Sequence, residues 1–155
     1  PMDAGDAAGL YPIFADPDVM RYFDDPHGAV SETERWVRTS AAAPPAETRE
    51  FTIRLDDKII GKAGIWKAPE LGFLLHRDHW RQGLMTEALE ALIPHLFATM
   101  ALPQITADVD PRNAPSLALL GRLGFAETHR AEKTIEIGGE WCDSVYLSLT
   151  APAKN

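Results

Sequence analysis

The segment of this chain best suited to bind a charged ligand is a glycine-bearing turn, Arg81-Gln82-Gly83-Leu84-Met85-Thr86. It lies between an apolar run at 71–75 and a long apolar-periodic stretch, which predicts a strand, a turn and a helix. The first turn of a helix has unpaired amides and the positive end of the dipole, and glycine lets an anion approach the backbone closely. Arg81 would add a positive charge and Thr86 a hydroxyl donor. On these residues alone, a phosphate site and a glycine that only supplies a left-handed turn are equally good explanations.

Other chemistries lack the residues that they need. A P-loop nucleotide site is disfavoured because Leu84 follows Gly83 and no Gly-Lys-Ser/Thr occurs. The single cysteine, Cys142, cannot form an intramolecular disulfide and supplies no metal framework, so we expect no metal. Lys and Arg total 15 against 23 Asp and Glu, a formal net charge of -8. This balance argues against nucleic-acid binding and would suit a cationic amine substrate.

The chain before residue 50 is predicted to be mainly helical. Apolar periodicity at 10–14 and a second short segment at 18–23 predict two short helices. Ser31 and Glu34 form a capping box for a third helix. The Pro/Ala-rich stretch 40–45 is expected to be a loop.

From residue 51 the apolar period changes to two, which predicts strands. Residues 51–55 alternate apolar and polar side chains, 56–58 form a turn, and 59–66 return as a second strand. The run at 71–75 is almost continuously apolar, which is typical of a strand buried on both faces.

A long helix, a strand and a shorter helix are predicted after the glycine turn. The long helix begins near Thr86 and contains Pro94, which should kink it. A strand at 105–109 leads to a helix that Asn113 or its neighbours cap. That helix ends at Gly124, a residue type suited to a left-handed position.

The end of the chain is predicted to be a hairpin of 133–137 and 141–149, joined at Gly138-Gly139. The complete pattern predicts an α+β fold with one mixed, mostly antiparallel sheet flanked by helices. The length of 155 residues fits one domain, 1–155. No apolar run is long enough to cross a bilayer and no leader opens the chain, so we expect a cytoplasmic protein without a membrane partner.

Three blocks of the sequence resemble the GNAT acyltransferase superfamily. The glycine turn resembles its motif A, although Trp80 replaces the leading Gln/Arg and Met85 the final small residue. Its context is similar to the branch of the ribosomal-protein N-terminal acetyltransferases RimJ and RimL. The matching parts are Glu70-Leu71-Gly72-Phe73, Trp80, Gly83 and Thr86-Glu87-Ala88.

Two later blocks support the same resemblance. Asn113-Ala-Pro-Ser116, followed by Leu123-Gly124-Phe125, resembles motif B of the superfamily, and Gly138 to Tyr146 resembles the closing hairpin of the branch. The resemblance covers residues 70 to 149 well, whereas the part before residue 50 matches only in character. The family normally opens with a strand before its first helix, so we expect that strand to be missing or trimmed in this sequence.

The resemblance implies an acetyl-CoA-dependent N-acetyltransferase with a cofactor cleft at the splayed central strands. The glycine turn would hold the pyrophosphate, the strand at 73–75 would contact the pantetheine and thioester, and Asn113 would touch the pantetheine arm. The residues expected to bind the coenzyme are Phe73, Leu74, Leu75, Arg81, Gln82, Gly83, Leu84, Met85, Thr86, Asn113 and Ser116.

The reaction implied is direct attack of an amine on the thioester, which needs a base and a proton donor. Glu70, at the start of the central strand, is the first candidate for the base, and Glu136 on the hairpin is the second. Many family members carry a tyrosine acid where this chain has Leu120. Ser116 is therefore the better candidate here, as in RimL-like enzymes.

The acceptor is expected to be a protein N-terminus or a small amine, and the sequence before residue 50 carries no specificity code that separates them. A non-catalytic acyl-CoA-binding or sensing domain is the alternative function, which Leu120 in place of tyrosine leaves open. A homodimer is also left open.

Overall fold

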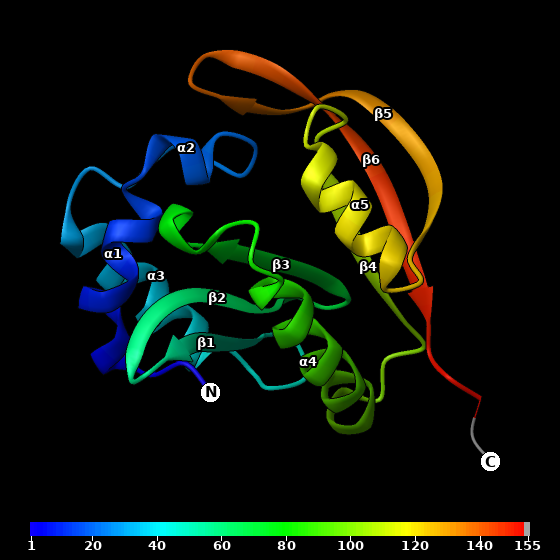
Figure 1. Cartoon of the computed structure of the whole chain (residues 1–155), viewed down its shortest axis with the longest axis horizontal. Helices are drawn as coiled ribbons and strands as arrows, with labels where there is room; N and C mark the ends of the chain where they lie inside the picture. Colours follow the sequence, from blue (N-terminus) through cyan, green and yellow to red (C-terminus); the bar gives the residue numbers. More distant parts are fainter. Residues whose placement is uncertain (154–155) are drawn as a thin grey trace.

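A computed structural model describes residues 1–153 as a six-stranded mixed sheet with helices on both faces (Figure 1). The predicted α+β architecture is confirmed. The helical elements are η1 (Ala4–Asp6), α1 (Ala7–Phe14), α2 (Pro17–Met20), α3 (Val30–Ala42), η2 (Arg77–His79), α4 (Leu84–Met100) and α5 (Ala114–Arg122). The strands are β1 (Arg49–Leu55), β2 (Lys58–Lys67), β3 (Glu70–Leu75), β4 (Gln104–Val109), β5 (Ala126–Ile137) and β6 (Glu140–Thr150).

The sheet is split at its centre, where β3 and β4 meet. The strand order is β1-β2-β3-β4-β6-β5, and every neighbouring pair except β3–β4 is antiparallel. The parallel pair is in register only at Glu70 and Thr106. Beyond that point the two strands diverge, so the edge of β3 that faces β4 is free of sheet partners.

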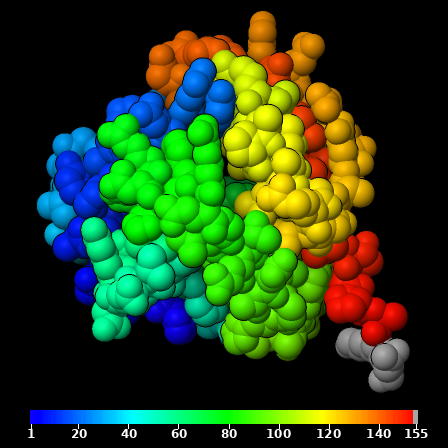
Figure 2. Space-filling view, in the orientation of Figure 1, coloured from blue at the N-terminus to red at the C-terminus, as the bar shows by residue number. Residues whose placement is uncertain are grey.

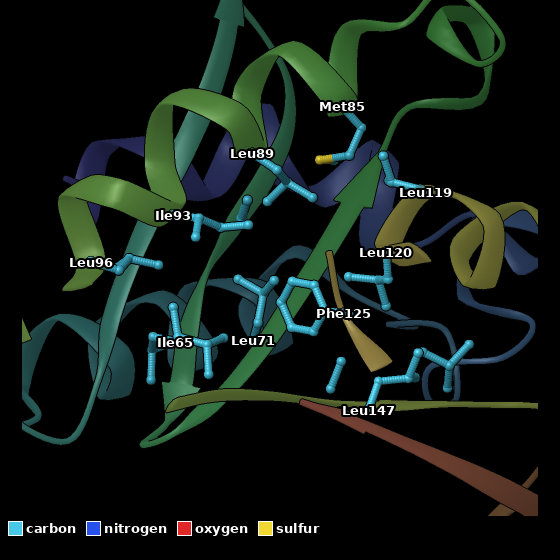
Figure 3. Close-up of a cluster of buried hydrophobic side chains, with 14 of the residues drawn as sticks. Ile65, Leu71, Met85, Leu89, Ile93, Leu96, Leu119, Leu120, Phe125 and Leu147 are labelled. Carbon is cyan, nitrogen blue, oxygen red and sulfur yellow. The ribbon is translucent and has the colours of Figure 1, made fainter. Parts of the chain in front are cut away.

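Strand β3 is buried on both faces, as its apolar run predicted. Leu71 and Leu75 belong to a core that α4 and α5 cover, whereas Leu74 belongs to a second core under α1 and α3. Figure 3 shows Leu89 and Ile93 of α4 pointing toward Ile65 and Leu71 of the sheet. The alternation therefore sorts side chains between a face under α4 and α5 and a face under the N-terminal helices.

Two predictions in the N-terminal part are wrong. Helix α3 begins at Val30 with Ala29 as its N-cap, and no side chain of the described residues caps it, so Ser31 and Glu34 form no capping box. Glu32 reaches back instead, and its carboxylate accepts a 2.8 Å hydrogen bond from the Gly28 amide. The helix also continues to Ala42, into the stretch expected to be a loop.

The boundaries after the glycine turn also differ from the prediction. Helix α4 begins at Leu84, two residues before Thr86, and it runs through Pro94 to Met100. Strand β5 begins at Ala126, well before the predicted start at residue 133. The sequence pattern missed the first half of this strand because most of its side chains are exposed and show no apolar alternation. No helix within residues 1–153 has the combined length and apolar character that spanning a bilayer requires.

Candidate active site

A cleft of about 750 Å³ opens where β3 and β4 diverge. Its walls are β3, the turn into α4, the carboxyl end of β4 and helix α5, and the segment Asp18–Phe23 borders one end. In Figure 2 the surface is hollowed between the green atoms that lead into α4 and the yellow atoms of α5. The cleft therefore lies at the split in the sheet.

The glycine turn forms one end of this cleft. Gly83 is the N-cap of α4 with φ 74° and ψ 8°, a left-handed conformation that favours glycine. The helical hydrogen bonds begin with the Glu87 amide, which donates to the Gly83 carbonyl at 3.0 Å. The amides of 84–86 precede that bond, and no side chain of the described chain caps the helix. A Cβ placed on Gly83 would meet no protein atom within 4 Å, so the space above the turn can hold a diphosphate.

The residues around Gly83 divide into two groups. Arg81, Leu84, Met85 and Thr86 line the cleft with Gly83. Gln82 does not line it, because its side-chain amide turns away and donates to the Asp78 carbonyl at 3.3 Å.

Phe73, Leu74 and Leu75 of β3 also line the cleft. Since β2 pairs with the other edge of β3, the edge toward β4 presents backbone groups to the cleft, where a ligand could pair as an added strand does. One of these groups has a partner, since the Leu75 carbonyl accepts a 2.8 Å hydrogen bond from the indole nitrogen of Trp80.

Helix α5 presents Asn113 and Ser116 to the cleft. The Asn113 side-chain oxygen caps the helix by accepting a hydrogen bond from the Ser116 amide at 3.4 Å, and Gly124 has a left-handed φ of 96°, so both predicted ends of this helix are confirmed. Leu120 is fully buried in the core and does not line the cleft. Among these α5 residues, Ser116 is thus the one with a hydroxyl group in the cleft wall.

Glu70 lies in the cleft on the sheet face opposite α4 and α5. Its carboxylate accepts a hydrogen bond from the indole nitrogen of Trp66. Burial raises the pKa of Glu70 above the ordinary carboxylate value, and the nearby charge of Asp108 raises it further, while Trp66 and Lys67 act in the opposite direction. A raised pKa brings a carboxylate closer to the neutral pH at which a general base works best.

Glu136 does not have the position that the sequence suggested. It lies on β5 opposite Trp141, its side chain is exposed, and it is not part of the cleft wall. Strand β5 is the outer strand of the sheet, separated from β4 by β6. The expectation that Glu136 faces the cleft is therefore wrong.

Several cleft residues near the end of β4 were not anticipated. Asp108, Asp110 and Arg112 line the cleft together with Tyr22. Arg112 donates hydrogen bonds of 3.0 and 2.8 Å to the two carboxylate oxygens of Asp110, which holds the pKa of Asp110 below its usual value. It also donates to Glu140 at 2.9 Å, and its guanidinium lies 5.2 Å from the centre of the Tyr22 ring. The only signal in the sequence that Asp108, Asp110 and Arg112 belong to the cleft was their position just before Asn113.

Comparison with known proteins agrees with this geometry. Residues 1–126 match the family model of the Acetyltransferase (GNAT) domain. The chain is 30% identical to the uncharacterized N-acetyltransferase p20 of Bacillus licheniformis, over 96% of this chain and 89% of that protein. It is 37% identical to the [ribosomal protein uS5]-alanine N-acetyltransferase of Escherichia coli, over 57% of this chain and 46% of that protein. The crystal structure of spermidine N-acetyltransferase from Vibrio cholerae, in complex with CoA and spermine, superposes with a TM-score of 0.83 at 19% identity, covering 96% of this chain and 91% of that one.

Proposed function

The chain belongs to the GNAT acetyltransferase family, and from this premise we propose that its cleft transfers an acetyl group from acetyl-CoA to the α-amine of a protein or peptide N-terminus. The observation that carries the proposal is the left-handed Gly83 turn at the open end of the parallel β3–β4 pair. That arrangement places an anion site and a free strand edge in one cleft.

The residues of the cleft have separable roles in this proposal. The amides of 84–86, with Arg81 and Thr86, bind the pyrophosphate, and Asn113 contacts the pantetheine arm. Acetyl-CoA supplies the acetyl group as an activated thioester. Backbone amides of the 73–75 segment donate to the thioester oxygen as it gains negative charge, an effect typically worth ~2.7–4 kcal/mol.

Glu70 acts as the general base and Ser116 as the proton donor. Glu70 takes a proton from the acceptor ammonium, so that the nitrogen gains a free electron pair. As the new C–N bond forms, the nitrogen loses its second proton to solvent. As the C–S bond breaks, the Ser116 hydroxyl gives a proton to the departing sulfur and regains one from solvent. The products are the N-acetyl amine, coenzyme A and one released proton.

An α-amine is the acceptor that a carboxylate base can serve most easily. Its pKa is about 7.7–8.0, against about 10.4 for a lysine amine, so roughly a tenth of it is neutral at pH 7. The 37% identity to an enzyme that acetylates a ribosomal-protein alanine supports the same choice. A small amine is the second candidate acceptor, and the net charge of -8 favours it because a negative field attracts cations.

The test has two stages. Thermal shift with acetyl-CoA measures coenzyme binding, and release of the coenzyme thiol is then measured with an alanine-initiated peptide, Nα-acetyl-lysinamide and spermidine as acceptors. We expect stabilisation by acetyl-CoA and the fastest thiol release with the peptide. Faster release with spermidine would replace the proposed acceptor by a small amine.

One observation favours a second function, an acyl-CoA-binding or sensing domain without turnover. Leu120 is buried where many family members carry a catalytic tyrosine, so only Ser116 is left on that helix to donate a proton. Stabilisation by acetyl-CoA, with no release of the coenzyme thiol in the presence of any of the three acceptors, would establish this alternative.

A further inference from the structure

Asp108 is the one cleft carboxylate besides Glu70 that has no basic partner. The other acidic groups at this end are neutralised, Asp110 by Arg112 at 2.8 Å and Asp18 by Arg77 at 2.9 Å. Within residues 1–153, no salt bridge joins Asp108 or Glu70 to a basic side chain. The cleft thus holds two uncompensated carboxylates on neighbouring strands.

The register of β3 and β4 places these two carboxylates on the same side of the sheet. Glu70 is paired with Thr106, and Asp108 lies two residues beyond Thr106, so the three side chains share one face. Ile105, Ala107 and Val109 point to the opposite face, into the core under α4 and α5. Two residues span about 7 Å along a strand and neighbouring strands lie about 4.8 Å apart. Asp108 is close enough for its charge to act on Glu70, so one small cation can interact with both carboxylates.

We propose, on the basis of the function assigned above, that Asp108 binds the ammonium form of the acceptor beside Glu70. The site thereby selects amines that arrive protonated. The face that carries both carboxylates is opposite the face of α4 and α5, whose first turns form the coenzyme end. The acceptor and the coenzyme therefore meet at the split from opposite sides of the sheet.

Binding of an ammonium group explains why the structure keeps two carboxylates without counter-ions. Asp108 reaches the solvent of the cleft, yet protein surrounds it closely enough that desolvation raises its pKa, against a hydrogen bond from Ser144. A cation placed between the carboxylates would stabilise the charged form of each. The proton then moves from the ammonium nitrogen to a Glu70 oxygen, while Asp108 keeps its negative charge beside the amine.

The other charged groups around Glu70 and Asp108 are either exposed or already paired. Lys67 is exposed and only partly offsets the charge near Glu70. Asp110 lies near Asp108 but is bonded to Arg112, and Arg21 also acts on Asp110. Tyr146, opposite Asp108 on β6, stacks on His129 at 4.4 Å between ring centres.

The experiment compares Asp108→Asn, the charge-keeping Asp108→Glu, and Glu132→Gln, which removes one negative charge from an exposed position of β5. With the best acceptor of the amine panel, Asp108→Asn should raise the acceptor KM at least tenfold and leave the acetyl-CoA KM within twofold. The acid limb of kcat/KM should move to lower pH, because removing a like charge lowers the pKa of Glu70. Asp108→Glu and Glu132→Gln should keep both properties close to the wild type.

An unchanged acceptor KM and acid limb in Asp108→Asn, with the wild type active, would overturn the role of Asp108 and leave the acetyltransferase function intact. Should the wild type release no thiol, the function proposed above fails, and carbon-13 NMR of the labelled carboxylates decides about Asp108. Methylammonium chloride should then shift the Glu70 and Asp108 signals in the wild type and leave the Glu70 signal of Asp108→Asn unchanged. Equal shifts of Glu70 in both proteins would overturn the ammonium site.

Discussion

The indole nitrogen of Trp80 donates a 2.8 Å hydrogen bond to the carbonyl oxygen of Leu75, the last residue of β3. This bond joins the loop that carries the glycine turn to the end of the strand that borders the coenzyme cleft. Trp80 stands where motif A usually has Gln or Arg, so the substitution supplies an aromatic clamp in place of a mobile polar side chain. The position of the turn relative to β3 depends on it.

Trp80→Phe keeps the ring and removes the donor, so it isolates this hydrogen bond. We expect the coenzyme A affinity to fall about tenfold, the equivalent of ~1.4 kcal/mol, because the turn loses its fixed distance from β3. Calorimetric titration with coenzyme A measures the effect. Trp141→Phe, at an exposed hairpin position, is the matched control and should leave the affinity unchanged.

Gly83→Val tests the anion site directly. A Cβ at this position meets no protein atom within 4 Å, so the main cost to the fold is the strain of a left-handed β-branched residue, while the methyl groups of valine enter the space assigned to the diphosphate. We expect coenzyme A affinity to fall at least a hundredfold. Gly139→Val is the control, since Gly139 has φ 78° and equally open surroundings on the hairpin. If Gly83→Val and Gly139→Val have similar melting temperatures and also bind coenzyme A with equal affinity, the site assignment is refuted.

The sequence predicted the parts of this molecule in which a local pattern has one structural solution. The alternation at 51–55, the apolar run at 71–75 and the capping residue Asn113 each gave the element that the structure contains. Gly83 could be assigned because a left-handed turn before a helix has few alternatives. These signals were sufficient for the fold, whereas the resemblance to the GNAT superfamily was needed to interpret the glycine turn as a coenzyme site.

The acceptor end could not be predicted in the same way, because its residues meet only through the sheet register. Nothing local connects Asp108 to Glu70, which is 38 positions earlier in the sequence and becomes its neighbour through one parallel pair. The prediction that Glu136 faces the cleft failed because strand order was unknown. The sequence placed Glu136 on the hairpin, but it did not show that β6 lies between its strand and β4. Strand order is a tertiary property that single-segment patterns do not contain.

Glu70→Gln tests the base. Since burial and the charge of Asp108 raise the pKa of Glu70, the wild-type kcat/KM should rise with pH through an acid limb centred above about 4.3, the ordinary value for glutamate. The variant should lose this limb and lose 10²- to 10⁴-fold in turnover, most strongly at pH values above the limb, where Glu70 is ionised in the wild type and the acceptor is still protonated. A pH profile of thiol release provides the measurement, with Glu90→Gln on the exposed side of α4 as the control. A profile that parallels the wild type would exclude Glu70.

Lys62 and Glu50 form a buried ion pair beside Phe23, in the segment Asp18–Phe23 that borders the cleft. The Lys62 ammonium lies 3.2 Å from both Glu50 oxygens and 5.4 and 5.3 Å from the ring centres of Phe23 and Trp36. Both charged side chains are almost completely inaccessible to solvent. The pair thus fixes the position of Phe23, which lines the cleft, on the sheet.

Lys62→Met should destabilise the protein by about 3–5 kcal/mol at neutral pH, because it leaves the Glu50 carboxylate buried without a partner. Burial already raises the pKa of Glu50, and loss of the Lys62 charge raises it further, so the folded state holds a proton that the unfolded state releases. Between the unfolded and the folded pKa, the variant should therefore lose about 1.4 kcal/mol of stability per unit of rising pH. Urea denaturation at several pH values measures this slope. Lys58→Met, at an exposed position of β2, should show neither effect, and adding Glu50→Gln to Lys62→Met should abolish the slope, since no buried carboxyl group then remains at this position to titrate.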